Sequence, residues 1–310
     1  MTVAARTLEE PPSILPLYLR AAAPMIPGAS ALPFVPGGGG EIPEIELRLD
    51  GVAAETAEIA AYARVCGFGL RDSLPPTYPH ILAFPLHMAV MADGGFPFGA
   101  VGLVHLENEI VQHRPIAIGE ELSLRVRPTA LQPHPKGRTF GLLTEVVVDG
   151  ETAWESTSTM LRRGGGSEGD AKEGGAGDFD GVPEEAPASA EWRLGDDLGR
   201  RYAAVSGDRN PIHMHALTAK PLGFPRAIAH GMWTKARCLA ALDNQVPGSF
   251  RARVRFKRPV LLPAKVEFAE RGEGGQIDFT VRDARKKTPH LDGRTEPLEP
   301  KPPSRRKQTK

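Results

Sequence analysis

Two side chains suited to proton transfer, Asp208 and His213, lie five residues apart in one polar segment. The segment, residues 206–213, reads SGDRNPIH, and its Gly207 and Pro211 favour a loop over a helix. A loop allows both side chains to face one cavity. A histidine titrates near neutral pH, and a nearby carboxylate raises its pKa or fixes its tautomer. The spacing therefore predicts a general acid–base pair that holds a water molecule and moves its protons.

A second chemical feature follows at residues 229–232, AHGM, where an apolar helix is expected to begin. The first N–H groups of a helix have no partner inside the helix, and the helix dipole makes this end positive. Gly231 lets a ligand oxygen approach these groups closely. We therefore expect Gly231 to contribute an oxyanion site, and His230 to support the substrate rather than carry the proton.

Two neighbouring polar residues, Asn210 and Ser206, have less specific roles. Asn210 either orients the water or substrate, or caps its own turn. Ser206 is expected to form structural or substrate hydrogen bonds, because no serine-hydrolase elbow surrounds it. His213 and His215 alternate without a third Cys, His or acid at a recognisable interval, so no metal site is predicted.

The composition excludes several classes of function. Of the 310 residues, 38 are Lys or Arg and 38 are Asp or Glu, so the formal net charge is zero. Nucleic-acid binding needs a basic surface, which this balance argues against. The two cysteines give no disulfide framework and fit a reducing compartment. No export signal or membrane span is recognisable, so a cytoplasmic protein is expected.

A row of basic residues has two possible roles. It alternates along a predicted strand and then continues beyond it. It is either a solvated strand face or a site for the phosphates of coenzyme A or for an acidic carrier protein, and the first interpretation is slightly favoured. The row consists of Arg251, Arg253, Arg255, Lys257 and Arg258.

The elements that position these residues form two units. Each unit places helices first and strands after them, which predicts an antiparallel sheet wrapped on a helix. The expected boundaries are a loosely structured extension at 1–40, a first unit at 41–163, a flexible Gly-rich acidic linker at 164–190, a second unit at 191–290 and a disordered basic tail at 291–310. The end of the second unit lacks apolar alternation, so its last strand is expected to be short or missing.

The two units repeat each other at three anchors in the same order. Residues 62–68 align with 202–208, residues 78–85 with 224–231, and residues 113–116 with 257–260. The first unit lacks the chemistry of the second. Phe68 stands in the place of Asp208, and the proline of Phe84-Pro85 has no N–H for an oxyanion. We therefore expect the second unit to be catalytic and the first to form an acyl pocket, with candidate lining residues Phe84, Met88 and Met91.

The stretch from Tyr202 to Met232 resembles the MaoC-like (R)-specific enoyl-CoA hydratases and 3-hydroxyacyl-thioester dehydratases. That family pattern runs Y-x-x-x-S-G-D-x-N-P-I-H, then G-F, then A-H-G-M, and every element is present here. One departure is Met214-His215, where the family usually has an Asp or Asn at the second position. This position does not carry the proton, so the departure concerns loop geometry.

The resemblance implies an α+β double hot-dog fold, with two antiparallel sheets each wrapped around a central helix. It implies reversible hydration of a trans-2-enoyl thioester to an (R)-3-hydroxyacyl thioester in fatty-acid metabolism, catalysed by Asp208 and His213 with Asn210. Gly231, Ser206 and His230 would bind the substrate. No metal or redox cofactor is implied, the substrate carrier is coenzyme A or acyl carrier protein, and the protein is a monomeric pseudo-dimer or a homodimer. The alternatives are a non-catalytic thioester-binding or partner protein, and a hot-dog thioesterase.

Overall fold

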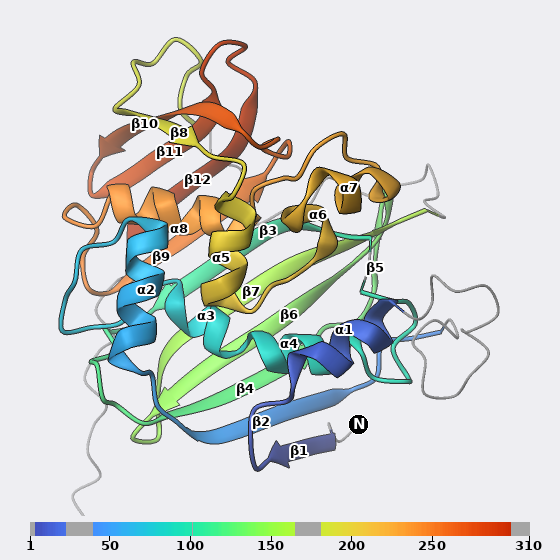
Figure 1. The fold of residues 1–310 in the computed structure, drawn as a ribbon. Helices are drawn as coiled ribbons and strands as arrows, with labels where there is room; N and C mark the ends of the chain where they lie inside the picture. The colour runs from blue at the N-terminus through green and yellow to red at the C-terminus, as the bar shows by residue number, and fades with distance from the viewer. Residues whose placement is uncertain (1–3, 23–39, 101, 165–180, 299–310) are drawn as a thin grey trace, which may run out of the picture.

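The computed structural model describes residues 4–22, 40–100, 102–164 and 181–298. They form a mixed α+β structure in which helices lie against one face of a large sheet (Figure 1). None of the helices in these ranges is long and apolar enough to cross a membrane.

The first unit is a sheet with the strand order β2-β4-β6-β7-β3. Its helix α4 is apolar on every side and is buried against β2 and β4, as expected of a central helix. Helices α2 and α3 precede α4, and the short β5 pairs with β6. The bounds are β2 Ile45–Val52, α2 Thr56–Cys66, α3 Tyr78–Leu82, α4 Phe84–Met91, β3 Leu103–Gln112, β4 Leu122–Pro128, β5 Gln132–His134, β6 Gly137–Val148 and β7 Glu151–Arg163.

The second unit repeats this arrangement with the strand order β9-β12-β11-β10-β8. Its central helix is α8, and a series of short helices connects α5 to it. The bounds are β8 Ala190–Leu194, α5 Leu198–Ser206, α6 Pro211–Met214, α7 Ala216–Ala219, η3 Lys220–Leu222, α8 Gly231–Ala241, β9 Phe250–Phe256, β10 Ala264–Glu273, β11 Gln276–Asp283 and β12 Pro289–Pro297.

The two sheets are joined edge to edge, because β3 pairs with β9 in antiparallel register. The expectation of two separate sheets is therefore modified to one continuous sheet. Glu109 pairs with Arg253, and these residues are 144 positions apart, as are the aligned His113 and Lys257. Equivalent residues of the two units thus face each other, which places a local two-fold axis at this pair.

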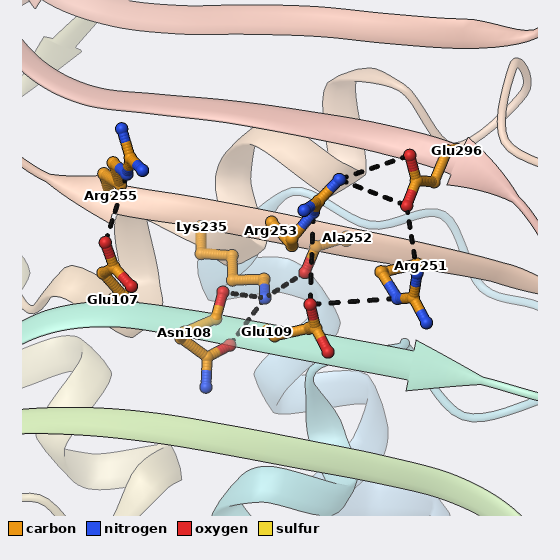
Figure 2. Close-up of polar contacts among 9 residues, drawn as sticks. All are labelled: Glu107, Asn108, Glu109, Lys235, Arg251, Ala252, Arg253, Arg255 and Glu296. Carbon is orange, nitrogen blue, oxygen red and sulfur yellow. Dashed lines mark hydrogen bonds and ion pairs between the residues drawn. The ribbon is translucent and has the colours of Figure 1, made fainter. Parts of the chain in front are cut away.

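We call the pair of strands β3 and β9 the seam between the units. A buried lysine of α8 forms hydrogen bonds to both of these strands (Figure 2). Lys235 Nζ donates to Asn108 O at 3.1 Å, to Asn108 Oδ1 at 2.5 Å and to Ala252 O at 3.0 Å. The Asn108 amide donates in turn to hydroxyls of β7, at Ser156 and Ser158. One side chain therefore ties the central helix of the second unit to both seam strands.

The last strand, expected to be short or missing, is present as β12 and runs to Pro297. The predicted tail boundary at 291 is therefore wrong. The inward positions of β12 include Gly293 and Thr295, which hide the apolar alternation of a buried strand. A Cβ at Gly293 would lie 2.3 Å from Cζ of Phe279, so the Phe279 ring fills the space instead. Residues 299–310 of the predicted tail lie outside the described residues.

The predicted linker is partly attached to the second sheet. Arg282 donates to the carbonyls of Glu184 and Ala186, the latter at 2.6 Å. These bonds fix the segment that leads into β8. Residues 165–180 of the predicted linker lie outside the described residues.

The N-terminal extension, expected to be loosely structured, contains β1 (Ala4–Leu8) and α1 (Ile14–Ala22). β1 pairs in parallel with β2 at the edge of the sheet, and α1 packs on α4. Pro16 occupies the first turn of α1, where a missing N–H costs no helical hydrogen bond. The buried Leu17 side chain anchors the helix in the core.

Candidate active site

One cavity of about 350 Å³ lies between the two units. The first unit contributes α3, α4 and β3 to its wall, and the second contributes the loops from α5 to α8 and the end of β9. Asp208, Asn210, His213, His230 and Gly231 all line it. The structure therefore brings the predicted site residues to one place.

The loop after α5 turns Asp208 toward this cavity. Gly207 ends the helix in the left-handed conformation, with φ 75°. The backbone N–H of Asp208 donates to Ser206 Oγ at 3.2 Å, and that of Asn210 donates to Asp208 Oδ1 at 3.1 Å. Ser206 therefore has a structural role in shaping the loop.

His213 is held on α6 with a defined tautomer. Its Nδ1 lies 2.8 Å from Ile228 O, and a carbonyl only accepts hydrogen bonds, so Nδ1 carries the proton. The Nε2 lone pair of the neutral ring remains available. Asn210 caps α6 by accepting from Ile212 N–H at 3.4 Å, which supports the capping role among its two predicted roles.

His230 lies directly on His213, with ring centroids 3.6 Å apart and an interplanar angle of 24°. His230 Nε2 lies 3.0 Å from Asp208 O, so this nitrogen carries the proton, and it lies 3.7 Å from Asp208 Oδ2. His230 therefore stabilises the loop that holds Asp208.

The protonation states follow from burial and from the short distances between these groups. Burial raises the pKa of Asp208, but the neighbouring His230 and His213, together with the hydrogen bonds from the Asn210 N–H and from Tyr18, hold the pKa below 3.8. Burial lowers the pKa of His213 below 6.5, against the opposing effect of Asp208, and it lowers that of His230 to about 3. At neutral pH the site therefore holds one carboxylate and two neutral imidazoles.

Gly231 is the first residue of α8, so its N–H has no helical acceptor. A Cβ at this position would lie 2.9 Å from Cε1 of Phe256, which explains the requirement for glycine. The helix thus presents a free backbone donor to the cavity beside Asp208 and His213.

Comparison with known proteins decides the family. A model of the MaoC like domain matches residues 180–293. Over 282 residues the chain is 39% identical to 3-hydroxyacyl-thioester dehydratase X of Mycobacterium tuberculosis, and the match covers 90% of this chain and 96% of that protein. The chain belongs to the MaoC-like dehydratase family.

Solved structures agree with this assignment. The crystal structure of HtdX of Mycobacterium tuberculosis has a TM-score of 0.72 at 36% identity, over 82% of this chain and 100% of that one. Another Mycobacterium tuberculosis protein, described as having a double hot-dog fold, has a TM-score of 0.53 at 14% identity, over 81% of this chain and 95% of that one. The latter likeness concerns the fold alone, and the predicted double hot-dog fold is confirmed.

Three side chains of the MaoC-like site are of types that can also bind a metal ion. Ligand atoms of Asp208, His213 and His230 lie within 4.8 Å of one another. However, the two imidazoles are stacked, and one nitrogen of each is used by a backbone carbonyl. One nitrogen of each ring therefore remains for a further partner.

Of the three residues predicted to line an acyl pocket in this MaoC-like protein, two line the cavity. Phe84 and Met91 line the cavity. Met88 does not line the cavity and packs in the core. The helix is apolar all round, so its sequence gave no signal for which side faces the cavity.

The basic row divides into two groups. Arg251, Arg253 and Arg255 pair with glutamates of β3 and β12 on the outer face of the sheet (Figure 2), with Arg255 Nε 3.1 Å from Glu107 Oε1. These three match the strand-face interpretation. Lys257 and Arg258 instead line the cavity.

Tyr18 of α1 is a site residue that the motif did not reveal. Its hydroxyl donates to Asp208 Oδ1 at 2.9 Å and accepts from Arg209 N–H at 2.7 Å. Burial, followed by the charge of Asp208, raises the pKa of Tyr18, so it remains a donor. It lies 190 positions from Asp208 in a segment outside the repeats, so the sequence pattern contained no signal for it.

Tyr18→Phe is expected to lower kcat by about ten- to a hundredfold with little change in KM. The phenol positions Asp208 but is not part of the cavity lining. Its loss also raises the pKa of Asp208, because the hydrogen bond from Tyr18 lowers it. Steady-state kinetics with an enoyl thioester at several pH values measures both effects.

Tyr62→Phe is the matched control, because it removes a similar buried hydrogen bond, to Thr77 Oγ1 at 2.8 Å, away from the cavity. Equal losses of kcat in the two variants would contradict a positioning role for Tyr18.

Proposed function

We propose that this protein catalyses the reversible hydration of trans-2-enoyl thioesters to (R)-3-hydroxyacyl thioesters. One observation carries the proposal: a carboxylate, a neutral imidazole with a free Nε2, and a helix-terminal N–H share one cavity. The names of the relatives support the reaction class, since they include a 3-hydroxyacyl-thioester dehydratase and a 3-hydroxybutyryl-CoA dehydratase. The (R) configuration is supported by the motif resemblance.

In the proposed mechanism, the Gly231 N–H donates to the thioester carbonyl and polarises the conjugated double bond. A water molecule lies between the Asp208 carboxylate and His213 Nε2. As the water oxygen adds to C3, the proton passes to His213 Nε2, whose lone pair is available because Nδ1 donates to Ile228 O, and the Asp208 carboxylate stabilises the protonated ring. The same proton is then returned to C2 of the enolate, so the net change is addition of one water molecule.

The remaining residues have supporting parts in this proposal. His230, Tyr18 and Asn210 hold the Asp208 loop, and Lys257 and Arg258 offer positive charge to the phosphate of the phosphopantetheine arm. That arm is common to coenzyme A and acyl carrier protein. The chemistry consists of proton transfers, so the proposal includes no metal or redox cofactor.

The proposed organisation follows from the repeat. The second unit supplies the proton-transfer groups and the first supplies the acyl pocket, so one chain contains both parts of the cavity. We place the protein in the cytoplasm, in keeping with Cys66 and Cys238, which are free and buried.

A single assay separates the proposed function from its two alternatives. The protein is incubated with crotonyl-CoA while enoyl absorbance and free thiol are followed together. Loss of absorbance without thiol release is the expected result. Thiol release would instead indicate a thioesterase, and binding without any change would indicate a thioester-binding protein.

The pH dependence of the reaction follows from the histidine. The reaction needs neutral His213, whose pKa lies below 6.5, so the rate should be level at neutral pH and should fall in acid as Nε2 is protonated. The sequence-based expectation placed this titration near neutrality, and burial moves it toward acid. We expect kcat/KM measured between about pH 4.5 and 8.5 to show one acid limb. A rate that rises as the pH falls would contradict the role of His213.

A further inference from the structure

Three histidines of the first unit, His80, His87 and His105, line the same cavity but have no part in the proton transfer. His80 and His87 are 7% and 3% exposed, and their ring centroids are 4.9 Å apart. His87 Nε2 lies 2.7 Å from Thr144 Oγ1, which orients its ring.

Two nitrogen atoms of this cluster are buried without a partner in the described part of the chain, namely His80 Nδ1 and His105 Nε2. Proteins pair nearly all of their buried polar atoms, so each exception indicates a missing partner. Both residues line the cavity, so a molecule in the cavity is the available partner.

The cluster lies close to Gly231 within the cavity. The Phe256 ring packs against Gly231, and the His105 ring lies 4.9 Å from that of Phe256. Phe84 and Met91 provide apolar surface in the same cavity. A chain whose carbonyl sits at Gly231 therefore has both apolar wall and imidazole nitrogens within the pocket.

The imidazoles in this cluster are neutral at physiological pH. Burial lowers the pKa of His87 to about 3 and that of His105 to about 4, with a smaller contribution to His105 from the nearby Lys235. Burial also lowers the pKa of His80 well below 6.5, as do His87, His105 and Lys235. The ring of His105 also forms a backbone hydrogen bond with Glu107, which leaves Nε2 as an acceptor.

We propose that the acyl pocket recognises a chain carrying a neutral hydroxyl group beyond the reacting carbons, bound by His80 Nδ1 and His105 Nε2. A hydroxyl has one donor hydrogen and two acceptor lone pairs, so it can donate to His105 Nε2 and accept from His80 Nδ1 when that nitrogen carries the ring proton. A plain alkyl chain would leave both nitrogens unpaired, and a carboxylate would gain no charge from neutral rings. The inference rests on the proposed function for the position of the chain.

The test uses saturated thioesters, which cannot react, so binding is measured apart from catalysis. ω-Hydroxyacyl-CoA and alkanoyl-CoA of equal length are compared by calorimetry, in pairs from about five to eight carbons, because cavity depth selects the length. We expect the hydroxylated member of at least one pair to bind about tenfold more tightly or better. Equal or weaker binding in every pair would overturn the proposal and would mean that water alone occupies these nitrogens.

Variants test whether the histidine cluster causes the preference for the hydroxylated chain. His80→Leu and His105→Leu are each expected to abolish this preference, and His80→Gln is expected to retain part of it. Met88→Leu is the control, since Met88 lies on α4 but outside the cavity lining. A preference that persists in both leucine variants would overturn the assignment, and thermal unfolding identifies any variant that fails to fold. Crotonyl-CoA turnover without a hydroxyl preference would refute this inference alone, whereas absence of turnover would refute the proposed function.

Discussion

Asp208→Asn is expected to lower kcat for crotonyl-CoA hydration by about 10³-fold or more. The amide is nearly the same size as the carboxylate and can still accept at Oδ1 from Tyr18 and from the Asn210 N–H, so the loop is expected to keep its shape. The substitution removes the negative charge. The carboxylate can then no longer accept a hydrogen bond from the water molecule or raise the pKa of His213. Stopped-flow or steady-state absorbance of the enoyl group gives the change in kcat.

Asp196→Asn is the matched control, since it removes the same charge from an exposed position in the same unit. It should leave kcat within about twofold of the unmodified protein. If Asp208→Asn retained a tenth or more of the activity, Asp208 would not be a member of the proton-transfer pair.

Lys235→Met is expected to lower the free energy of unfolding by about 3 kcal/mol, because several buried acceptors lose their donor at once. Lys235 is fully buried, and its three hydrogen bonds match the three donors of an ammonium group. Methionine fills similar space but cannot satisfy the carbonyls of Asn108 and Ala252 (Figure 2). Urea unfolding at neutral pH, followed by circular dichroism, measures the loss.

An exposed lysine provides the comparison. Lys265 pairs with Glu191 at 2.5 Å, but the two side chains are 51% and 41% exposed. Exposed pairs contribute little, so Lys265→Met should change stability by less than about 1 kcal/mol. Equal effects of the two substitutions would show that the seam does not depend on Lys235.

The sequence contained enough to predict the fold and the local part of the site. The loop residues Asp208 and His213 are close in the chain, and Gly231 follows from a helix start, so short-range rules were sufficient. The repeat further indicated that the first unit lacks these groups, and the structure places Phe84-Pro85 at the start of α4, where α8 has His230-Gly231.

The features that the sequence did not predict depend on contacts between distant segments. Tyr18 reaches Asp208 across 190 positions, and no local pattern encodes such a contact. The sequence pattern did not reveal strand β12, because its buried positions include Gly293 and Thr295 rather than large apolar residues. The Phe279 ring fills the space beside Gly293. His87 lies on a helix that is apolar on nearly all sides, where periodicity cannot distinguish cavity from core.

Hydration of crotonyl-CoA in D₂O tests the central claim most directly, because it follows the proton as well as the product. The account predicts (R)-3-hydroxybutyryl-CoA carrying one deuterium at C2, formed by the unmodified protein and almost absent with Asp208→Asn. Recovery of crotonyl-CoA unchanged and without hydrated product, or formation of the (S) alcohol, would contradict it.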